Sequence, residues 1–349
     1  MKKWLSNIER RFDTDDKSKY DCVLNQSERT SHIPDELYQE FLSNLKQEDF
    51  FYYPNTKNFK EKICKFYGVK INQLFLCNGS DFGLRCIFEA FLDDYQNVIT
   101  TTPSFPMYQV YTELEQCYTK LVGHEKDYTI DIEKFKGAIN NHTSLIVLAN
   151  PNSPMGELKS HEEILSIFDN QFVKKYNLPV VVDEAYIEFT ENESLVKYVD
   201  KYPNLIVTRT FSKGFGAAGC RVGMVFSNEK NIELISKFRQ MYEVTNISMK
   251  YCEFLLDNYS VVNDYIENVK IEKKKIISLL RDDFDVIDSN CNWIHFNNEV
   301  DNVDTMKTFK NHKVLVKYCS VPHDDRKNWC RLTIQPEMSN LDFIKEMLL

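Results

Sequence analysis

Thr210–Arg221 reads TFSKGFGAAGCR, and this stretch is the most informative part of the 349-residue chain. It follows the apolar, β-branched run Leu205–Arg209, which is typical of a buried strand. Lys213 therefore stands just beyond the end of a strand, among hydroxyl-bearing and small residues. An amine in this setting suits imine formation, and the hydroxyls of Thr210 and Ser212 together with Arg221 suit a phosphate.

A second apolar run ends in an acid and is followed closely by a phenol. Val180–Val182 leads into Asp183, and Tyr186 comes three residues later. A carboxylate at the end of a buried strand is costly unless it is paired, and a protonated pyridine nitrogen would pair it. Tyr186 would then reach the phenolic oxygen of the same ring. A lysine Schiff base with an acid opposite a pyridine nitrogen indicates pyridoxal 5′-phosphate, PLP. A helix cap at Asp183 and a buried structural phenol at Tyr186 are the alternatives.

Three further segments suit a phosphorylated, planar cofactor and an anionic substrate. Asn78–Asp81 follows the first expected strand and opens a helix, so the backbone N–H groups of this turn can receive a phosphate; an ordinary N-cap is the alternative. Phe105 follows the second expected strand and suits stacking on a ring, or a place in the core. Arg331, in the strand-like run Trp329–Thr333, suits a bidentate grip on a carboxylate, or a structural ion pair.

Apolar runs alternate with amphipathic segments, which predicts a three-layer α/β fold around a mostly parallel, seven-stranded sheet. Helices are expected over Phe82–Leu92 and Glu162–Tyr176, between strands of the sheet. The expected strands are Gln73–Leu76, Asn97–Thr101, Cys117–Val122, Leu145–Ala149, Pro179–Val182, Leu205–Arg209 and Val222–Phe226.

The texture changes after Asn228, where a long charged helix over Val261–Leu280 precedes short strands and helices. This pattern predicts a smaller α+β domain. We expect an N-terminal arm over residues 1–30 that packs with the small domain, a large PLP-binding domain over 31–245 and the small domain over 246–349.

Composition excludes several other classes of protein. The net charge of −9 argues against a nucleic-acid partner. Ten cysteines without a C-x-x-C pair indicate reduced thiols and no metal site. The start of the sequence has no apolar signal region, and no apolar run reaches the ~18 residues of a membrane span. We expect a cytoplasmic protein with no membrane association.

In their order along the chain, these motifs resemble fold-type I PLP enzymes, specifically class I/II aminotransferases of the histidinol-phosphate aminotransferase type. The resemblance extends from Leu24–Glu28 to Arg331. It implies Lys213, Asp183 and Tyr186 as catalytic residues, and Arg331 as a substrate ligand. It also implies a homodimer with shared active sites, because Tyr53 matches a tyrosine that this family lends to the neighbouring subunit. The implied cofactor ligands are Tyr53, Gly79, Ser80, Asp81, Phe105, Ser153, Asp183, Tyr186, Thr210, Ser212, Lys213 and Arg221.

The chain departs from the family pattern at three places. Ser153, in Pro151–Gly156, stands where an asparagine usually binds the cofactor's ring oxygen. Lys317 keeps the charge of a substrate-phosphate arginine but loses its planar fork. Arg29 lies near the expected substrate entrance, and we expect Arg29 and Lys317 to contact an anionic substrate tail.

The resemblance implies transfer of an amino group from a small phosphorylated amine or amino acid, like histidinol phosphate, to a keto acid such as 2-oxoglutarate. One alternative uses the same residues for decarboxylation of O-phosphoserine or O-phosphothreonine, because a small rotation of the substrate selects a different bond at Cα. A second alternative is a catalytically silent binding protein of the same fold. The presence of Lys213 argues against that alternative, because a binding module needs no imine-forming lysine.

Overall fold

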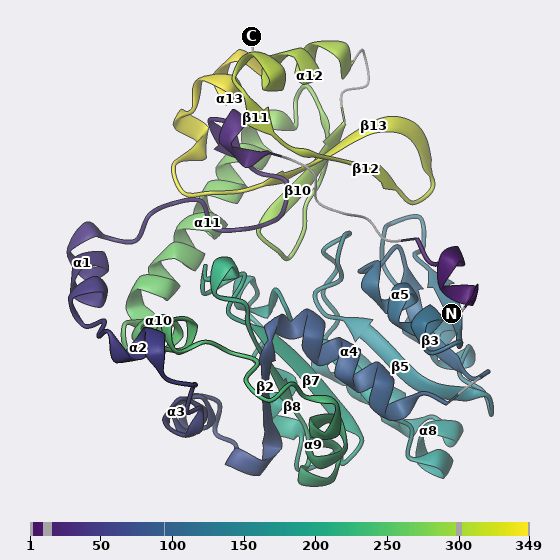
Figure 1. Ribbon diagram of the computed structural model, residues 1–349. Coiled ribbons are helices and arrows are strands. Elements are labelled where there is room, and N and C mark those ends of the chain that lie inside the picture. Colours follow the sequence, from purple (N-terminus) through teal and green to yellow (C-terminus); the bar gives the residue numbers. More distant parts are fainter. Residues whose placement is uncertain (1–2, 10–15, 94, 298–301, 348–349) are drawn as a thin grey trace.

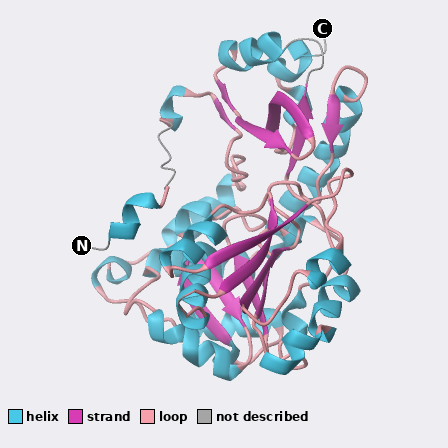
Figure 2. Cartoon of the chain, turned by 90° about the vertical axis from the view of Figure 1, so that its right-hand side faces the viewer, coloured by secondary structure: helices cyan, strands magenta, loops and turns pink. Residues whose placement is uncertain are grey.

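A computed structural model describes residues 3–9, 16–93, 95–297 and 302–347. The chain forms two units, each with its own sheet, and the long helix α11 (Tyr259–Leu280) runs from one to the other (Figure 1). Figure 2 shows the smaller sheet above the larger one. The α/β fold with a large sheet and a smaller α+β unit agrees with the prediction.

The large sheet has seven strands in the order β2-β8-β7-β6-β5-β3-β4. Its parallel pairs are β3 with β4, β3 with β5, β5 with β6 and β6 with β7, while β8 runs antiparallel to β2 and β7. The sheet is therefore mostly parallel, as expected. The strands are β2 (Leu74–Asn78), β3 (Asn97–Thr102), β4 (Tyr118–Gly123), β5 (Thr143–Ala149), β6 (Val180–Asp183), β7 (Leu205–Thr210) and β8 (Val222–Phe226).

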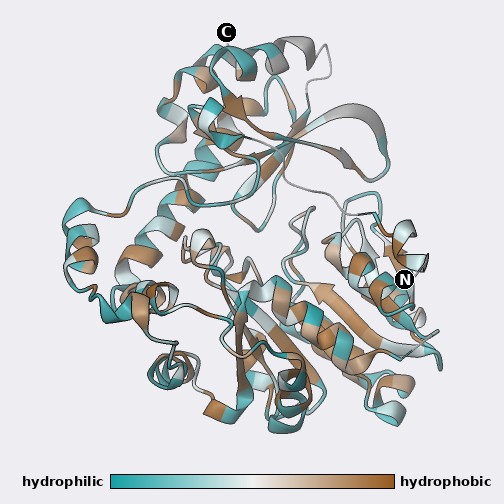
Figure 3. Ribbon diagram, viewed as in Figure 1, coloured by the Kyte–Doolittle hydropathy of each residue, from teal (hydrophilic) through white to brown (hydrophobic). Residues whose placement is uncertain are grey.

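The central strands are apolar because both of their faces are covered. Val180 and Val182 belong to one hydrophobic core, and Val181 between them belongs to a second core on the opposite face. Figure 3 shows this as strands that are hydrophobic along most of their length. Since the strand interiors are filled by apolar side chains, polar chemistry is confined to the strand ends.

Helices cover the large sheet, and one expected helix is interrupted. The expected helix Glu162–Tyr176 is divided because Asn170 is extended and accepts the N–H of Phe172 as the cap of a new helix. The helices of this part of the chain are α1 (Asp35–Ser43), α2 (Glu48–Phe51), α3 (Lys57–Tyr67), α4 (Gly79–Phe91), α5 (Met107–Leu114), α6 (Ile132–Gly137), α7 (His161–Leu165), α8 (Gln171–Tyr176) and α9 (Glu229–Ile235).

The small unit is built on a four-stranded antiparallel sheet in the order β12-β13-β10-β9. The helix α10 (Asn246–Asp257) precedes α11 and contacts α2, α3 and β8 of the large unit. The remaining elements are β9 (Asp285–Ile287), β10 (Trp293–Asn297), α12 (Asn302–Asn311), β11 (Val314–Leu315), β12 (Lys317–Val321), β13 (Asp324–Thr333) and α13 (Asp342–Met347).

The N-terminal segment contacts both units. β1 (Cys22–Val23) pairs in parallel with β11 of the small unit, and the carbonyl of Leu24 accepts the N–H of Thr333. Further towards the N-terminus, Trp4 and Leu5 lie beside α4 and α5 of the large unit. Residues 1–2 and 10–15 of the expected arm lie outside the described residues. Among the described residues, no helix has both the length and the apolar character needed to cross a membrane.

Candidate active site

The polar strand ends surround a cavity of about 490 Å³. Strands β5, β6 and β7 contribute residues at or near their carboxyl ends, where parallel α/β sheets bind ligands. The N-terminal segment closes another side with Gln26 and Glu28. Of the residues expected in the site, ten line the cavity: Ser80, Asp81, Phe105, Ser153, Asp183, Tyr186, Thr210, Ser212, Lys213 and Arg221.

Lys213 lies in the cavity wall with its amine directed at the N-terminal segment. Its Nζ donates to the carbonyl of Gln26 at 2.8 Å and lies 5.5 Å from the ring centre of Tyr186. Burial, followed by repulsion from Arg331, lowers the pKa of Lys213 from 10.5 to about 7. A substantial fraction of this amine is therefore unprotonated near neutral pH, which is the form that attacks a carbonyl carbon.

Asp183 is buried at the end of β6 and is held by two hydroxyls. The hydroxyl of Tyr108 donates to Oδ2 at 2.7 Å, and that of Thr208, on β7, donates to Oδ1 at 2.7 Å. Burial raises the pKa of Asp183, while these two hydrogen bonds oppose the rise. A buried carboxylate fixed in this way and facing a cavity is suited to a cationic ring nitrogen.

Tyr186 joins the two units at the cavity. Its ring meets Trp293 of β10 edge to face, with the ring centres 4.6 Å apart. Burial raises the pKa of Tyr186 to about 12. The phenol therefore stays protonated at neutral pH and can donate a hydrogen bond to an oxygen in the cavity.

The expected phosphate site is assembled from two segments far apart in sequence. A Cβ added to Gly79 would lie 2.5 Å from Nη2 of Arg221, and one added to Gly223 would lie 2.1 Å from the backbone nitrogen of Ser80. Nη1 of Arg221 donates to Oγ of Ser212 at 3.4 Å. The absence of side chains at these two glycines thus brings backbone N–H groups, a hydroxyl and a guanidinium into one cradle, and this donor set fits a phosphate.

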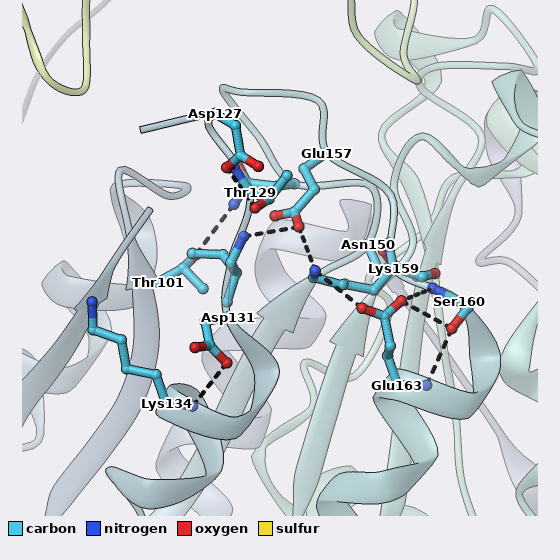
Figure 4. Close-up of polar contacts among 12 residues, drawn as sticks. Thr101, Asp127, Thr129, Asp131, Lys134, Asn150, Glu157, Lys159, Ser160 and Glu163 are labelled. Atoms are coloured by element: carbon cyan, nitrogen blue, oxygen red, sulfur yellow. Dashed lines mark hydrogen bonds and ion pairs between the residues drawn. The ribbon is translucent and has the colours of Figure 1, made fainter. Parts of the chain in front are cut away.

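The loop that carries Ser153 is fixed at both ends. Asn150 and Lys159 exchange hydrogen bonds of 2.8 and 3.1 Å between the side chain of Asn150 and the backbone of Lys159. The amine of Lys159 lies between Glu157 at 2.7 Å and Glu163 at 3.1 Å (Figure 4). This network holds the loop while Ser153 lines the cavity.

The small unit supplies two cations near the cavity. Arg331 is buried on β13, where Nη2 donates to the carbonyl of Asn25 at 3.1 Å and the guanidinium lies 5.0 Å from the ring centre of Trp293. Lys317 is its cross-strand neighbour on β12. Both charges contribute to lowering the pKa of Lys213, after burial. Both therefore lie within electrostatic reach of Lys213, although neither lines the cavity.

Two other expected site residues lie outside the cavity wall. Tyr53 is exposed and stacks on Tyr242, with the ring centres 4.2 Å apart. Arg29 lies over Tyr265 at 4.4 Å and donates to the carbonyls of Ser31 and His32, each at 3.0 Å. The structure thus places Arg29 in contacts with neighbouring protein groups.

Sequence reasoning missed the contribution of four residues. Tyr108 and Thr208 hold Asp183, and Gln26 and Glu28 line the cavity. Thr208 has a local signal, because a hydroxyl inside an apolar strand next to the strand that carries the acid needs a buried partner. For Gln26 and Glu28 the sequence gives no such signal, since they reach the cavity through the path of the N-terminal segment.

The fold and the cavity define a fold-type I PLP-dependent enzyme. Lys213, Asp183 and the phosphate cradle formed around Gly79 and Arg221 fit the aldehyde, the ring nitrogen and the phosphate of this cofactor. Residues 22–344 match aminotransferase class I and II, and the chain belongs to this family.

The relatives share one activity in their names. A histidinol-phosphate aminotransferase of Clostridium novyi is 28% identical over 331 residues, covering 93% of this chain and 90% of the relative. A histidinol-phosphate aminotransferase of Pyrococcus furiosus is 31% identical over 259 residues, covering 74% of each. The protein is a PLP-dependent aminotransferase of class I/II.

Solved structures agree on the fold. Histidinol-phosphate aminotransferase from Sinorhizobium meliloti, in complex with pyridoxal-5′-phosphate, matches with a TM-score of 0.87 and 17% identity, covering 100% of this chain and 96% of that one. L-threonine-O-3-phosphate decarboxylase from Porphyromonas gingivalis matches with a TM-score of 0.78 and 20% identity, covering 93% and 98%. The fold is therefore shared by enzymes of both reaction types.

Proposed function

We propose that this aminotransferase takes its amino group from a small phosphorylated amine or amino acid, with histidinol phosphate as the best candidate. A keto acid such as 2-oxoglutarate accepts the group. The names of the relatives support this choice of donor. The observation that carries it is that cations flank Lys213 from two separate units.

The two sets of cations suit two different anions. Arg221, beside Ser212 and the Gly79 turn, suits the phosphate of the cofactor. Arg331 and Lys317 belong to the small unit and suit the anionic tail of the substrate. A donor with an amine at one end and a phosphate at the other would place its reacting carbon beside Lys213.

The remaining residues divide the work around that carbon. PLP supplies an electron sink for the negative charge that develops at the substrate carbon. Lys213 holds the cofactor when no substrate is bound, and its freed amine then moves the proton at the substrate Cα. Asp183 keeps a proton on the ring nitrogen, and Tyr186 and Ser153 bind the ring oxygen. Phe105 stacks on the ring, while Ser80, Asp81, Thr210 and Ser212 help to fix its orientation.

The proposal includes a homodimer in which Tyr53 enters the cavity of the partner. Phe50, Phe51, Tyr52 and Tyr53 form a continuous run of exposed aromatic residues, and Tyr242 stacks on the last of them. Exposed apolar runs of this kind are typical of protein interfaces. A second copy of the chain would cover this run and bring Tyr53 to a cofactor phosphate.

We also propose that the enzyme works in the cytoplasm. All ten cysteines are free thiols, and six of them are buried or lie inside secondary structure away from one another in sequence. Thiols that remain reduced are typical of a reducing compartment.

A donor screen tests the proposed reaction. Purified enzyme with PLP is mixed with histidinol phosphate, O-phosphoserine or O-phosphothreonine, with and without 2-oxoglutarate, while glutamate and carbon dioxide are measured. Glutamate formation from histidinol phosphate that depends on the keto acid is the expected result. Carbon dioxide release without a keto acid would instead assign a decarboxylase.

A further inference from the structure

Glu28 lines the active-site cavity and has no role in the chemistry described above. We propose that the carboxylate of Glu28 determines donor specificity: it binds an N–H-bearing or cationic group at the side-chain end of the amino donor, such as an imidazole. Lys17 neutralises Glu28 while the donor is absent. This inference rests on the proposed function and names the group that the same site reads.

The backbone around Glu28 is fixed by the small unit. Ser27 is buried with φ of +57°, a left-handed conformation that is unusual for serine. Its N–H donates to Oγ1 of Thr333 at 3.1 Å, and its carbonyl accepts from Asn292 at 3.2 Å. The carbonyl of Glu28 accepts from Gln335 at 2.7 Å. The strained residue is thus anchored on both sides, and its neighbours in sequence both line the cavity.

The side chain of Glu28 has an exchangeable partner. Its Oε2 lies 2.7 Å from Nζ of Lys17, and the same amine donates to Oε1 of Gln26 at 2.9 Å. The side chain of Lys17 is 38% exposed, so this amine can return to water with little cost. A cationic or N–H-donating group in the cavity can therefore replace it on Glu28.

The other two carboxylates of the described cavity wall already have fixed partners. Asp183 accepts from Tyr108 and Thr208, and Asp81 accepts from the hydroxyl of Tyr111 at 2.8 Å. The charge of Glu28 also acts inside the cavity, since it opposes the lowering of the Lys213 pKa that burial causes. Glu28 is thus the carboxylate of this wall that is placed to read a substrate.

An aminotransferase receives its donor and its acceptor in one cavity, and Glu28 affects the two in opposite ways. A bare carboxylate attracts an imidazole N–H and repels a dicarboxylic keto acid. Pairing with Lys17 cancels that repulsion when the keto acid is bound. Removing Glu28 should therefore weaken the donor and strengthen the acceptor, whereas a general structural defect would weaken both.

The test compares wild type, Glu28→Gln and Lys17→Gln as PLP-loaded enzymes. The donors are histidinol phosphate and phenylalaninol phosphate, which differ in the ring and in its N–H groups; the acceptor is 2-oxoglutarate. We expect Glu28→Gln to lower the preference for the imidazole donor in kcat/KM by about tenfold, because a charge-assisted hydrogen bond is lost. The KM for 2-oxoglutarate should fall in the same variant.

Lys17→Gln keeps the test decisive if Glu28→Gln does not fold. Unmasking Glu28 should lower the KM of the imidazole donor and raise that of 2-oxoglutarate. An imidazole preference unchanged in Glu28→Gln, or in Lys17→Gln a donor and acceptor KM that move together, would overturn the inference. Failure of the wild type to use either phosphorylated donor would instead overturn the proposed function.

Discussion

Gly79 lies so close to Arg221 that a methyl group on Gly79 would stand 2.5 Å from Nη2 of the guanidinium. The two residues belong to the turn after β2 and to the loop before β8, which are adjacent strands of the sheet. Phosphate binding in this enzyme thus depends on a contact that leaves no room for a side chain.

Gly79→Ala should therefore weaken PLP binding by displacing Arg221. Alanine at a φ of +75° also strains the backbone by about 1 kcal/mol. Gly68→Ala is a matched control, because Gly68 has a φ of +69° and nothing within 4 Å of an added Cβ. We expect both variants to lose similar thermal stability as apoproteins, and only Gly79→Ala to show a raised Kd for PLP in a titration of visible absorbance.

Lys213→Ala should abolish both turnover and the visible absorbance of the bound cofactor. The loss of rate should be about 10²- to 10⁴-fold or more, because Lys213 moves the proton at the substrate Cα. The exposed lysine Lys237 provides the control, and Lys237→Ala should retain full activity. Normal turnover by Lys213→Ala would refute the assignment.

Tyr108→Phe should reduce cofactor affinity, since it removes one of the two hydroxyls that fix Asp183. Loss of a hydrogen bond to a charged group costs about 1.5–3 kcal/mol, which corresponds to a roughly tenfold or greater rise in Kd. Tyr118→Phe, on the exposed strand β4, removes a hydroxyl far from Asp183 and should leave the Kd unchanged. Equal Kd values for all three proteins would show that Asp183 does not need Tyr108.

Reconstitution of the apoenzyme with PLP should accelerate as the pH rises through about 7. Burial and then Arg331 lower the pKa of Lys213, so its amine is protonated and unreactive below that pH. Arg331→Gln should move the midpoint of the rate profile upwards, while Arg331→Lys keeps the charge and should leave it near its original position. A midpoint in Arg331→Gln that stays fixed or moves down would contradict the electrostatic role.

The same shift has a consequence for the stability of the apoprotein. Between pH 7 and 10.5 the unfolded chain binds a proton on Lys213 that the folded chain does not, so the free energy of unfolding rises with pH in this window. Lys213→Met should lack this rise. Urea unfolding of both apoproteins across the window measures the difference, and parallel profiles would refute the shift.

A shared active site predicts complementation between two impaired variants. In a mixed dimer of Lys213→Ala and Tyr53→Ala, one site carries both substitutions and the other carries neither. Random mixing should therefore restore about a quarter of wild-type activity at limiting PLP. Activity that stays at the average of the two homodimers would show that Tyr53 does not cross to the partner.

Local sequence was sufficient for the strands and for the order of the motifs. Val180–Val182 reads as a buried strand because both faces of the sheet demand apolar side chains, and the acid that follows it falls at the strand end for the same reason. The helix expected over Glu162–Tyr176 shows the limit of this reasoning. Hydrophobic spacing continues across Asn170, but the capping hydrogen bond of that residue starts a new helix.

Tertiary structure decided which groups meet. Tyr108 lies 75 residues before Asp183, and Arg331 lies 306 residues after Asn25, so no local pattern records either contact. The path of the N-terminal segment turned Arg29 towards Tyr265 and brought Glu28 to the cavity. The sequence by itself determined the sheet, the family and the lysine at its centre, because those depend on short-range periodicity and fixed spacing. The partners of Asp183 and the acid at the cavity wall depend on how distant segments close around the cavity, and only the folded chain specifies them.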